Sequence, residues 1–562
     1  MDERRLLMAV ALSLVVLTAY SYLFAPPPRP QPSPGTRRPS GPVPATAEAP
    51  PPPSVGSVPP SPLRTPEARV TDARERRVEV SGRDIVLAFT NRGARLLSWQ
   101  LRHFLDGRGR PEEMVQASVT GPRPLDIETG DAELDARLRE ALFEPSGEGL
   151  VIGEREPVTL VFRFSDGEVA AEKELTFQPR GYLVAVRASV RRGGQPLAAR
   201  LLWGPGVGNP TAAERGVQGY VSPHGVALAG GSVERFPADK LPPTGQPLGG
   251  VRWAGVESHY FAALFVPPGE AGAVSLRSAP LPAYDDGKEN LGPLVSMDLG
   301  LSPGPALLYV GPKDYQEMSR AGHQLARLVV WHMGEWIGPP IVVPLTGLVR
   351  WVHSYVGNYG WAIVLVTIMI NLVMAPFRHY SIANGMKMSR LAPEMKVIQE
   401  RYRKVPLMDP KRQQMQEEMG ALYAKHGMSM GTQMLVGCLP LLLTMPFLIA
   451  FYRVLTVAIE LRGAPFLWVN DLSHPDPLFL TPVLMGVSMF AMQKMTPTTM
   501  DPAQQRIMMI MPLMFAGMFL WAPAGLNLYW LSSNLCAIAQ QGLTLRLLKG
   551  HVAAPAAARK RK

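Results

Sequence analysis

Residues 507–545 read IMMIMPLMFAGMFLWAPAGLNLYWLSSNLCAIAQQGLTL, a run of 39 residues without one charged side chain. At about 1.5 Å per residue, a single helix of this length would be nearly twice as long as the ~30 Å hydrocarbon core of a bilayer. The run must therefore fold back. The APAG sequence at 522–525 is the expected turn, because proline and glycine interrupt helices. The sequence thus predicts two adjacent membrane spans, at about 507–521 and 525–545.

Further apolar segments lie on the N-terminal side of this pair. Three more spans are expected at about 354–377, 433–456 and 478–494, which completes a five-span core over residues 351–548. Residues 6–25 form another apolar run of the ~20 residues that one membrane helix needs. We interpret segment 1–25 as a retained anchor and not a cleaved signal peptide, because its apolar core is long, Tyr22 stands where a small residue is needed, and prolines follow directly. The sequence therefore predicts six spans.

The charges of the loops set the expected orientation. The loop 378–427 carries ten Lys and Arg residues, whereas the loop 457–477 carries one, Arg462. Cytoplasmic loops hold the excess of basic residues, so the first of these loops is expected in the cytoplasm. The MDERR start and the basic tail 549–562, which ends in RKRK, then lie on the same side. The net charge of +11 therefore reflects membrane topology and does not indicate a DNA-binding surface.

The polar first half of the chain has two parts. Residues 26–66 are dominated by proline, which predicts an extended polyproline linker. From about residue 67 the pattern alternates with a period of two, as in RVEVSGRDIVLAF at 77–89, LVFRFSDGEV at 160–169 and YLVAVRASV at 182–190. This pattern predicts an antiparallel all-β domain over residues 67–320, which the orientation places outside the cytoplasmic membrane, in a periplasm if the cell is Gram-negative.

Several functional classes lack their usual signals. An ion-coupled transporter usually needs acidic residues within its spans. The expected spans contain no Asp or Glu between their ends. A Walker loop and the HExxH and CxxC motifs are absent from the sequence, and Cys438 and Cys536 lie in apolar runs as packing residues. We therefore expect neither an enzyme nor a bound metal or other cofactor.

Uncharged polar residues stand at membrane depth instead. Asn371 lies in the middle of the apolar run VTIMINLVMAPF at 366–377, and Thr367 precedes it by four residues on the same helix face. An unsatisfied amide in hydrocarbon costs several kcal/mol, so each such group needs a partner or water. Two interpretations remain open: hydrogen bonds between helices, or a shared wet cavity, which the spacing of this pair favours. The other polar residues at this depth are Thr444, Ser532, Ser533, Asn534, Gln540 and Gln541.

The loop 378–430 predicts an antiparallel helical hairpin in the cytoplasm. Apolar residues recur there at alternating intervals of three and four, and continue after the break at KVPLMDP. Many are methionines, of which the chain has 28, and methionine-rich surfaces accommodate apolar partners of varied shape. The basic residues face solvent or lipid headgroups, with ribosome contact as the open alternative. The expected seam is Met388, Leu391, Met395, Ile398, Tyr402, Met415 and Met419.

These motifs together resemble the YidC family of membrane protein insertases. The resemblance is dense over about residues 350–548, in NYGWAIVLVTIMI, MKMSRLAPEMKVIQE, CLPLLLTMPFLIAFYRVL, ELRGAPFLWVNDLSHPDPLFLTPVLMGVSMFAMQKM and WAPAGLNLYWLSSNL. In the β domain it rests on FTNRGARLLSWQL, SHYFAALFVPP and YVGPKDY. The layout is similar to the Gram-negative form, with an anchor, a large periplasmic domain and a five-span core.

The resemblance implies a fold and an activity. It implies an inner-membrane insertase and chaperone that works without ATP on nascent membrane proteins, alone or with the Sec translocon, with membrane lipids, the ribosome and the signal recognition pathway as further partners. The five spans would surround a hydrophilic groove that is open to the cytoplasm and to lipid. The β domain would be a supersandwich, and an amphipathic helix in region 321–350, matched by GHQLARLVVWHMGEW at 322–336, would lie along the outer interface.

The resemblance also implies site residues. The groove would comprise Thr367, Asn371, Thr444, Tyr529, Trp530, Ser533 and Asn534, and incoming apolar helices would slide along Met445, Pro446, Met514 and Met518. Two positions depart from the family pattern, since Asn371 stands where an arginine is usual and Thr444 where a glutamine is common. Arg378 follows about two turns later, toward the cytoplasmic end, and is not expected to replace that arginine.

Two readings from other classes stay open at this point. The β domain could be a carbohydrate-binding or carbohydrate-active module tethered by the core, with His224, Glu257 and His259 as available acid and base groups. The core could also be a channel or transporter, which would show ion flux through the purified protein.

Overall fold

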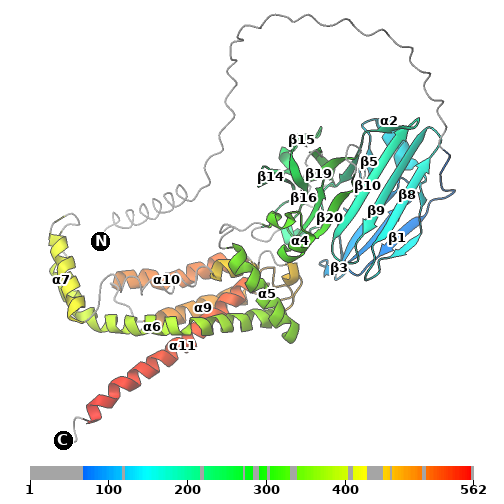
Figure 1. Cartoon of the computed structure of the whole chain (residues 1–562). Coiled ribbons are helices and arrows are strands. Elements are labelled where there is room, and N and C mark those ends of the chain that lie inside the picture. The colour runs from blue at the N-terminus through cyan, green and yellow to red at the C-terminus, as the bar shows by residue number, and fades with distance from the viewer. Residues whose placement is uncertain are drawn as a thin grey trace, which may run out of the picture. The chain divides into compact units, whose positions relative to one another are not determined.

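The computed structural model describes residues 68–116, 121–215, 220–269, 273–282, 290–299, 304–329, 338–402, 405, 409, 411–426, 447–452, 454–455, 459–496 and 502–558. Several expected features lie outside these residues. They are the anchor 1–25, the linker 26–66, and the sites Thr444, Met445 and Pro446. Along the described part, strands come first and long helices follow (Figure 1).

The described strands of the β domain form three sheets. The first has the order β4 (Pro111–Glu113), β3 (Arg95–Leu105), β2 (Ile85–Thr90), β1 (Arg77–Ser81) and β7 (Gly149–Val151). The second has the order β14 (Ser232–Pro237), β13 (His224–Ala229), β16 (Val251–Glu257), β17 (Phe261–Val266), β20 (Ala306–Pro312), β10 (Leu183–Arg192), β9 (Val169–Phe177), β8 (Val158–Ser165) and β6 (Glu144–Pro145), with β11 (Gln195–Leu197) beside β10. The third has the order β15 (Gln246–Leu248), β18 (Val274–Leu281), β19 (Asn290–Leu299), β12 (Ala199–Trp203) and β5 (Ile127–Glu128).

The period-two pattern gives the strands that it predicts. The stretch 77–89 forms β1 and most of β2, and β9 alternates buried with half-buried residues along its whole length. Every pairing between described strands is antiparallel except that of β1 with β7, which is parallel. One apolar core joins the sheets, and in it Trp99 and Trp203 meet edge to face with ring centroids 5.6 Å apart.

A buried lysine lies at the centre of this core. Lys173, in β9, donates hydrogen bonds from Nζ to the carbonyl oxygens of Ala94 at 2.7 Å and Leu125 at 2.6 Å. Burial lowers the pKa of Lys173 from 10.5 to about 8. The two carbonyls accept hydrogen bonds from two of its three N–H donors, but the side chain holds its proton less readily than it would in water.

The burial of Lys173 predicts that the β domain becomes more stable as the pH rises from about 8 to about 10. In this window the unfolded chain binds more protons at this position than the folded chain, so the free energy of unfolding increases with pH, by on the order of 3 kcal/mol. Urea unfolding of the full chain, followed by tryptophan fluorescence, measures this slope. The Lys173→Met variant should lose the slope, and an unchanged slope in that variant would contradict the assignment.

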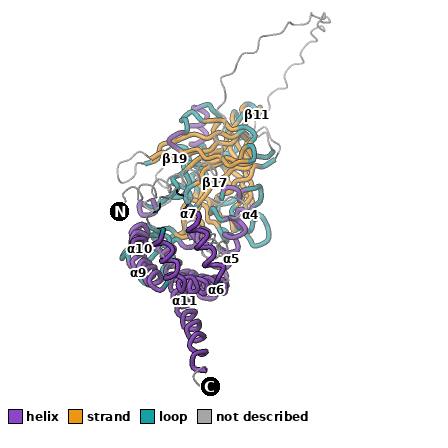
Figure 2. Tube along the Cα trace, turned by 90° about the vertical axis from the view of Figure 1, so that its left-hand side faces the viewer, coloured by secondary structure: helices purple, strands orange, loops and turns teal. Residues whose placement is uncertain are grey.

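The helices of the β domain are short, and those of the second part are long. The short ones are α2 (Ala132–Glu140), α3 (Ala212–Arg215) and α4 (Tyr315–Ala321), with 3-10 turns η1 (Ala238–Lys240) and η2 (Leu325–Leu328). The second part contains α5 (Gly338–Val356), α6 (Tyr359–Arg401), α7 (Lys411–Lys425), α9 (Leu480–Met495), α10 (Pro502–Met518) and α11 (Ala524–Ala558), with turns η3 (Ile459–Leu461) and η4 (Phe519–Trp521). Figure 2 shows α6, α9, α10 and α11 gathered together.

The first core span begins later than the sequence predicts. Residues 354–356 belong to α5, and the chain breaks at Gly357, whose φ is +69°, a backbone conformation that glycine adopts without strain. Asn358 then caps the next helix, because its side chain accepts the N–H of Trp361. From Tyr359 the helix α6 continues for 43 residues, so the span and the first arm of the hairpin are one helix.

The turn in the long apolar run lies where proline and glycine predict it. Helix α10 ends at Met518, η4 follows, and α11 begins at Ala524, so residues 522–523 join the two helices. Helix α9 matches the span expected at 478–494 within two residues. Among the described helices, α6 is long and apolar enough to cross a membrane by itself, and 507–521 is a shorter apolar helix. The count of six spans stays a prediction.

In its described part, the segment expected to form an amphipathic helix contains only a short 3-10 turn. Within 322–329 the structure has the turn η2, whose Leu325 and Leu328 are buried in the core of the β domain. The helix that precedes the core is α5, at Gly338–Val356. These leucines therefore face protein, which the sequence pattern alone does not distinguish from a membrane interface.

The helical hairpin of α6 and α7 packs along the expected seam. Leu391 and Met395 of α6 are buried against Leu422 and Tyr423 of α7, with Met388, Ile398 and Met419 partly buried around them. At the far end, Glu418 accepts a hydrogen bond from Tyr402 at 2.8 Å and pairs with Arg401 at 2.9 Å. Met415 lies on α7 and is half-buried.

Candidate functional site

Helix α11 is joined to α6 and α9 by polar side chains. Towards α6, Gln540 donates to the carbonyl oxygen of Ala375 at 2.6 Å, and His379 Nδ1 lies 3.2 Å from the Thr544 hydroxyl. Towards α9, Asn534 donates to the Ser488 hydroxyl at 2.9 Å. For Asn534 and Gln540 the sequence left two interpretations open, and both side chains make a hydrogen bond between helices.

A buried carboxylate positions the start of α9. Asp476 is fully buried and accepts the backbone N–H groups of Leu478 at 2.9 Å and Thr481 at 2.7 Å. Its carboxylate also accepts the indole N–H of Trp468 at 3.1 Å. Backbone amides at a helix start lack partners within the helix, so this carboxylate both caps α9 and fixes the preceding loop against it.

A cavity of about 490 Å³ lies between α6, α9 and α11. Its wall mixes apolar side chains with uncharged polar ones and one charged side chain, Arg378. The sequence-predicted residues that the structure brings together there are Asn371, Tyr529, Trp530, Ser533 and Asn534. The remaining lining residues are Ile370, Met374, Arg378, Ser381, Ile382, Phe447, Leu448, Met489, Met492, Thr496, Ala537 and Gln541.

Asn371 presents an unsatisfied acceptor at this cavity. Its side chain is 7% exposed, and its Nδ2 donates to the Thr367 carbonyl oxygen at 2.7 Å and to the Ser533 hydroxyl at 3.5 Å. Because a carbonyl only accepts hydrogen bonds, the assignment of Nδ2 and Oδ1 is fixed. Oδ1 is buried and has no hydrogen-bond partner among the described residues. A buried acceptor of this kind needs a donor from water or from a bound molecule.

Thr367 supports Asn371 and does not line the cavity. It is fully buried, and its hydroxyl donates to the Ile363 carbonyl oxygen of its own helix at 2.7 Å. The spacing of four residues thus does place the two residues together, through the backbone oxygen of Thr367 and the amide of Asn371.

The cavity ends against an apolar cluster on the Tyr359 side of α6. Ala362, Ile363 and Val366 are fully buried in this cluster, and the lining of the cavity begins only at Ile370. Tyr529 stacks on Phe451 with ring centroids 4.1 Å apart, which covers the boundary. The polar space therefore belongs to the half of the core nearer the hairpin, and the half nearer the β domain is packed with hydrocarbon side chains.

Arg378 is the site residue that the sequence reasoning set aside. It lines the cavity seven residues after Asn371, which is two helical turns and hence the same face. Its Nη1 is buried without a hydrogen-bond partner among the described residues. The signal that could have found it is this spacing of seven, combined with the absence of any acidic residue in the neighbouring spans.

The residues expected to guide apolar helices lie elsewhere. Met514 and Met518 of α10 are 69% and 56% exposed, and neither lines the cavity. Their exposure fits a surface that faces lipid or an apolar partner, because large apolar side chains exposed on a water-facing surface are unfavourable. Met489 and Met492 of α9 line the cavity instead.

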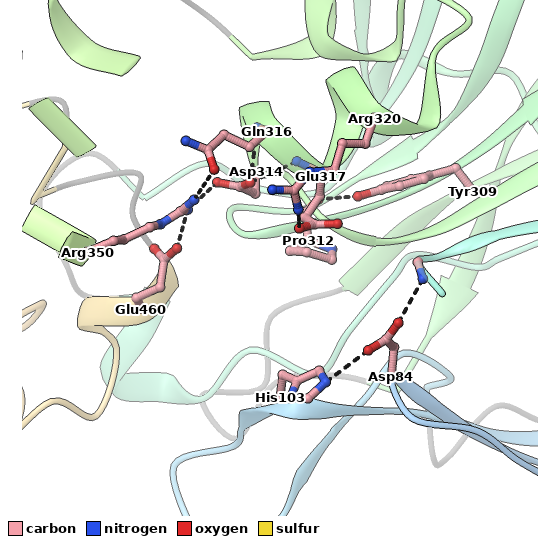
Figure 3. A network of polar contacts seen from close by, with 11 residues as sticks. Asp84, His103, Tyr309, Pro312, Asp314, Gln316, Glu317, Arg320, Arg350 and Glu460 are labelled. Carbon is pink, nitrogen blue, oxygen red and sulfur yellow. Dashed lines mark hydrogen bonds and ion pairs between the residues drawn. The ribbon is translucent and has the colours of Figure 1, made fainter. Parts of the chain in front are cut away.

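Two arginines connect the core to the β domain. Figure 3 shows Arg350 of α5, which donates to Asp314 at 2.5 Å and to Gln316 at 3.0 Å and also pairs with Glu460 of η3. Nearby on the β domain, His103 Nε2 lies 2.9 Å from Asp84 (Figure 3). These contacts lie apart from the cavity.

Arg462 forms the more deeply buried of the two connections. It pairs with Glu112 at 2.6 Å and with Glu214, and all three side chains are less than one-tenth exposed. Burial raises the pKa of Glu112, and the charge of Arg462 opposes that rise. Two carboxylates thus share the guanidinium of Arg462. From the sequence, Arg462 was only the single basic residue of the loop 457–477.

Of the three residues considered for catalysis in the β domain, Glu257 is held in two ion pairs. Glu257 is fully buried and pairs with Arg235 at 2.7 Å and Lys313 at 2.8 Å. Burial alone would raise the pKa of Glu257, but the charges of Lys313 and Arg235 outweigh it and hold the pKa below its ordinary value. A carboxylate whose pKa is lowered by two paired cations is a poor general acid, so the carbohydrate-active reading is not favoured.

Known proteins resemble this chain along nearly its whole length. Residues 351–551 match the family described as 60Kd inner membrane protein, and residues 77–344 match the YidC periplasmic domain. The membrane protein insertase YidC of Maridesulfovibrio salexigens is 31% identical over 98% of this chain and 100% of its own length. That of Syntrophus aciditrophicus is 33% identical over 81% of this chain and 82% of its own. A crystal structure of an active YidC insertase covers 85% of this chain and 95% of its own, with 17% identity and a TM-score of 0.34. From its similarity to full-length relatives, the chain belongs to the YidC family of membrane protein insertases.

Proposed function

We propose that the cavity between α6, α9 and α11 receives the polar segment of a nascent membrane protein while its apolar helix passes into lipid. The observation that carries this proposal is the buried Oδ1 of Asn371, an acceptor without a hydrogen-bond partner among the described residues, on a side chain that lines a cavity in an apolar bundle. Moving a short polar segment across ~30 Å of hydrocarbon exposes its amides at several kcal/mol each. A polar cavity that reaches halfway shortens the dry part of this path.

The apolar helix of the incoming protein would contact exposed apolar faces of the helix bundle. The apolar helix 507–521 has 15 residues, about 22 Å of helix, which is less than the ~30 Å core of a bilayer. A short helix of this kind thins the surrounding bilayer, which lowers the barrier further. Met514 and Met518 on its exposed face suit incoming helices of varied sequence. Burial of the apolar helix in lipid then drives insertion without ATP.

The proposed orientation has both termini and the hairpin in the cytoplasm and the β domain in the periplasm, with six spans in the inner membrane. The excess of basic residues in the loop 378–427 supports it. On this orientation the cavity faces the side where nascent chains arrive. The hairpin and the basic tail are then the surfaces for the ribosome, the signal recognition pathway and anionic headgroups, and the Sec translocon is the partner for larger substrates.

Site-specific photocrosslinking tests the proposal. A photoreactive residue at position 533, in the cavity wall, should crosslink to the polar tail of a single-span test protein caught during insertion into vesicles. The matched control is position 372 on α6, which follows Asn371 but is 67% exposed and does not line the cavity. Equal crosslinking from the two positions, or crosslinking of the tail from position 372 alone, would overturn the proposal.

A further inference from the structure

The segment between η3 and α9 exposes three large apolar side chains. Leu467 is 69% exposed, Leu478 is 65% exposed and Phe479 is 45% exposed. We call these three residues the apolar rim. The stretch 463–470 around the first of them reads GAPFLWVN and carries no charge. Large apolar side chains exposed in this number on one short segment indicate contact with a partner or with a membrane.

The backbone holds two of the rim residues in a conformation that is unusual for bulky side chains. Leu467 and Phe479 each have a φ of +52°, in the left-handed region that favours glycine and asparagine. Leu467 stands in a two-residue turn, in which Phe466 and Val469 exchange both backbone hydrogen bonds, at 2.8 Å and 2.9 Å. Asn or Gly usually occupies such a position. Leucine therefore adds strain to the turn while most of its side chain stays outside the protein, which indicates a function at the surface.

The turn packs against the first residues of α6, which fixes its depth. The ring of Phe466 lies over Gly360, where a Cβ atom would come within 2.1 Å of it, and meets Trp361 edge to face with ring centroids 5.4 Å apart. Helix α6 is long and apolar enough to cross a membrane, and it begins at Tyr359. The turn therefore lies at the end of this span. Trp361 is itself exposed, and exposed tryptophans are typical of the boundary between hydrocarbon and lipid headgroups.

The buried carboxylate of Asp476 connects the two parts of the rim. It accepts the indole N–H of Trp468, the neighbour of Leu467 in the turn, and it also accepts the backbone N–H of Leu478. One fully buried side chain thus holds both parts in place. The rim is a fixed surface of the protein and not the end of a free loop.

The exposed apolar surface continues from the rim along α9. Leu480, Val483 and Val487 are exposed and recur on one face of this helix at intervals of three and four residues. Because the family is membrane-embedded, an exposed apolar face of this kind lies against lipid hydrocarbon. The rim extends the same surface by the residues that precede the helix, so its continuity with α9 favours lipid as the occupant.

We propose that the apolar rim inserts among the lipids of the leaflet on the β-domain side and holds this end of the core at a fixed depth. The contact is separate from the cavity and does not rest on the proposed function. Arg462, five residues before Leu467, is ion-paired with Glu112 of the β domain. One short segment therefore contacts the β domain at one point and the lipid at the next, so that it sets the height of the β domain above the bilayer.

The test measures the depth of the rim with the full chain in vesicles that contain no other protein. Single spin labels are attached to the variants L467C and L478C, in a chain in which Cys438 and Cys536 have been replaced by alanine. Collisions of the label with oxygen, which concentrates in hydrocarbon, are compared with collisions with a water-soluble nickel chelate. Oxygen collisions should exceed nickel collisions severalfold at both positions. L105C is the matched control, since Leu105 of β3 is 54% exposed in the β domain, and there the nickel collisions should dominate.

A further variant separates a lipid contact from a role in the turn alone. L467N introduces a polar residue that suits the positive φ, and it should lower the oxygen-to-nickel ratio of a label at position 478. An unchanged ratio would show that Leu467 serves only the turn, and the inference would be wrong. It is also wrong if labels at 467 and 478 behave like the label at 105. If those two labels meet nickel freely in the vesicles but are shielded in native membranes, a partner protein covers the rim and lipid insertion is overturned.

Discussion

Arg462→Leu should lower the free energy of unfolding by about 3–5 kcal/mol, the largest effect on stability expected in this chain. Arg462 is buried between Glu112 and Glu214, so its removal leaves two buried carboxylates facing each other without a cation. Tyr260 also loses the guanidinium that lies 5.7 Å from its ring centroid. Urea titration of the detergent-solubilised chain with a brief protease pulse measures the change.

Matched variants separate the buried charge from the lost contact. Arg200→Leu is the control, because Arg200 pairs with Asp298 on the surface and is 55% exposed, where such pairs contribute about 1 kcal/mol or less. Adding Glu112→Gln and Glu214→Gln to Arg462→Leu should recover part of the loss, since uncharged amides are less costly to bury. An Arg462→Leu chain that unfolds at the same urea concentration as the unmodified chain would show that the connection contributes nothing.

Asn371→Leu should reduce insertion of substrates with polar translocated tails about tenfold and leave substrates with short apolar tails nearly unchanged. The substitution removes the one orphaned acceptor that Asn371 presents to the cavity and makes that wall apolar, so a passing backbone N–H loses a partner worth about 1–1.5 kcal/mol. The bundle itself should tolerate leucine, because the neighbouring Ile370 and Met374 are apolar. Insertion of paired test proteins into proteoliposomes, scored by protease protection of the tail, gives the ratio.

The control for Asn371→Leu uses the next residue. Leu372→Ala changes a side chain that is 67% exposed and does not line the cavity, and it should affect both kinds of substrate equally and weakly. Equal losses for polar and apolar tails in Asn371→Leu would make Asn371 a packing residue and would remove the observation on which the proposed function rests.

The sequence predicted the fold well wherever a local rule decided the structure. Proline and glycine at 522–525 predicted the turn between α10 and α11, and period-two alternation predicted β1, β2, β8 and β10. The start of α6 was less accurate because Gly357 and Asn358 end one helix and cap the next, while the apolar pattern runs across both. A periodic pattern reports which face is buried, but it does not report where one helix stops if the following residues are equally apolar.

The sequence predicted only the part of the candidate site that a local pattern reveals. Asn371 and the polar residues of α11 were found because polar groups in an apolar run are conspicuous. Arg378 was assigned to the cytoplasmic end by its distance along the chain, yet its side chain lies on the same helix face as Asn371 and lines the same cavity. The partnership of Arg462 with Glu112 and Glu214 joins residues 350 and 248 positions apart, and no local pattern contains such contacts.

Helix α6 has a mechanical consequence. One continuous helix of 43 residues, about 65 Å long, carries the cavity wall in its middle and the first arm of the hairpin at its C-terminal end. A helix transmits tilt and rotation along its length. A force on the hairpin is therefore also a torque on Asn371 and Arg378, unless the helix bends between the hairpin and these residues. Pro376 and Pro393 remove the backbone hydrogen bonds to the carbonyl oxygens of Leu372 and Ser389, which makes these two turns the most compliant points of the helix. The stiffness of these two turns thus sets how far a nascent chain that pulls on the hairpin also reshapes the path that it is about to enter.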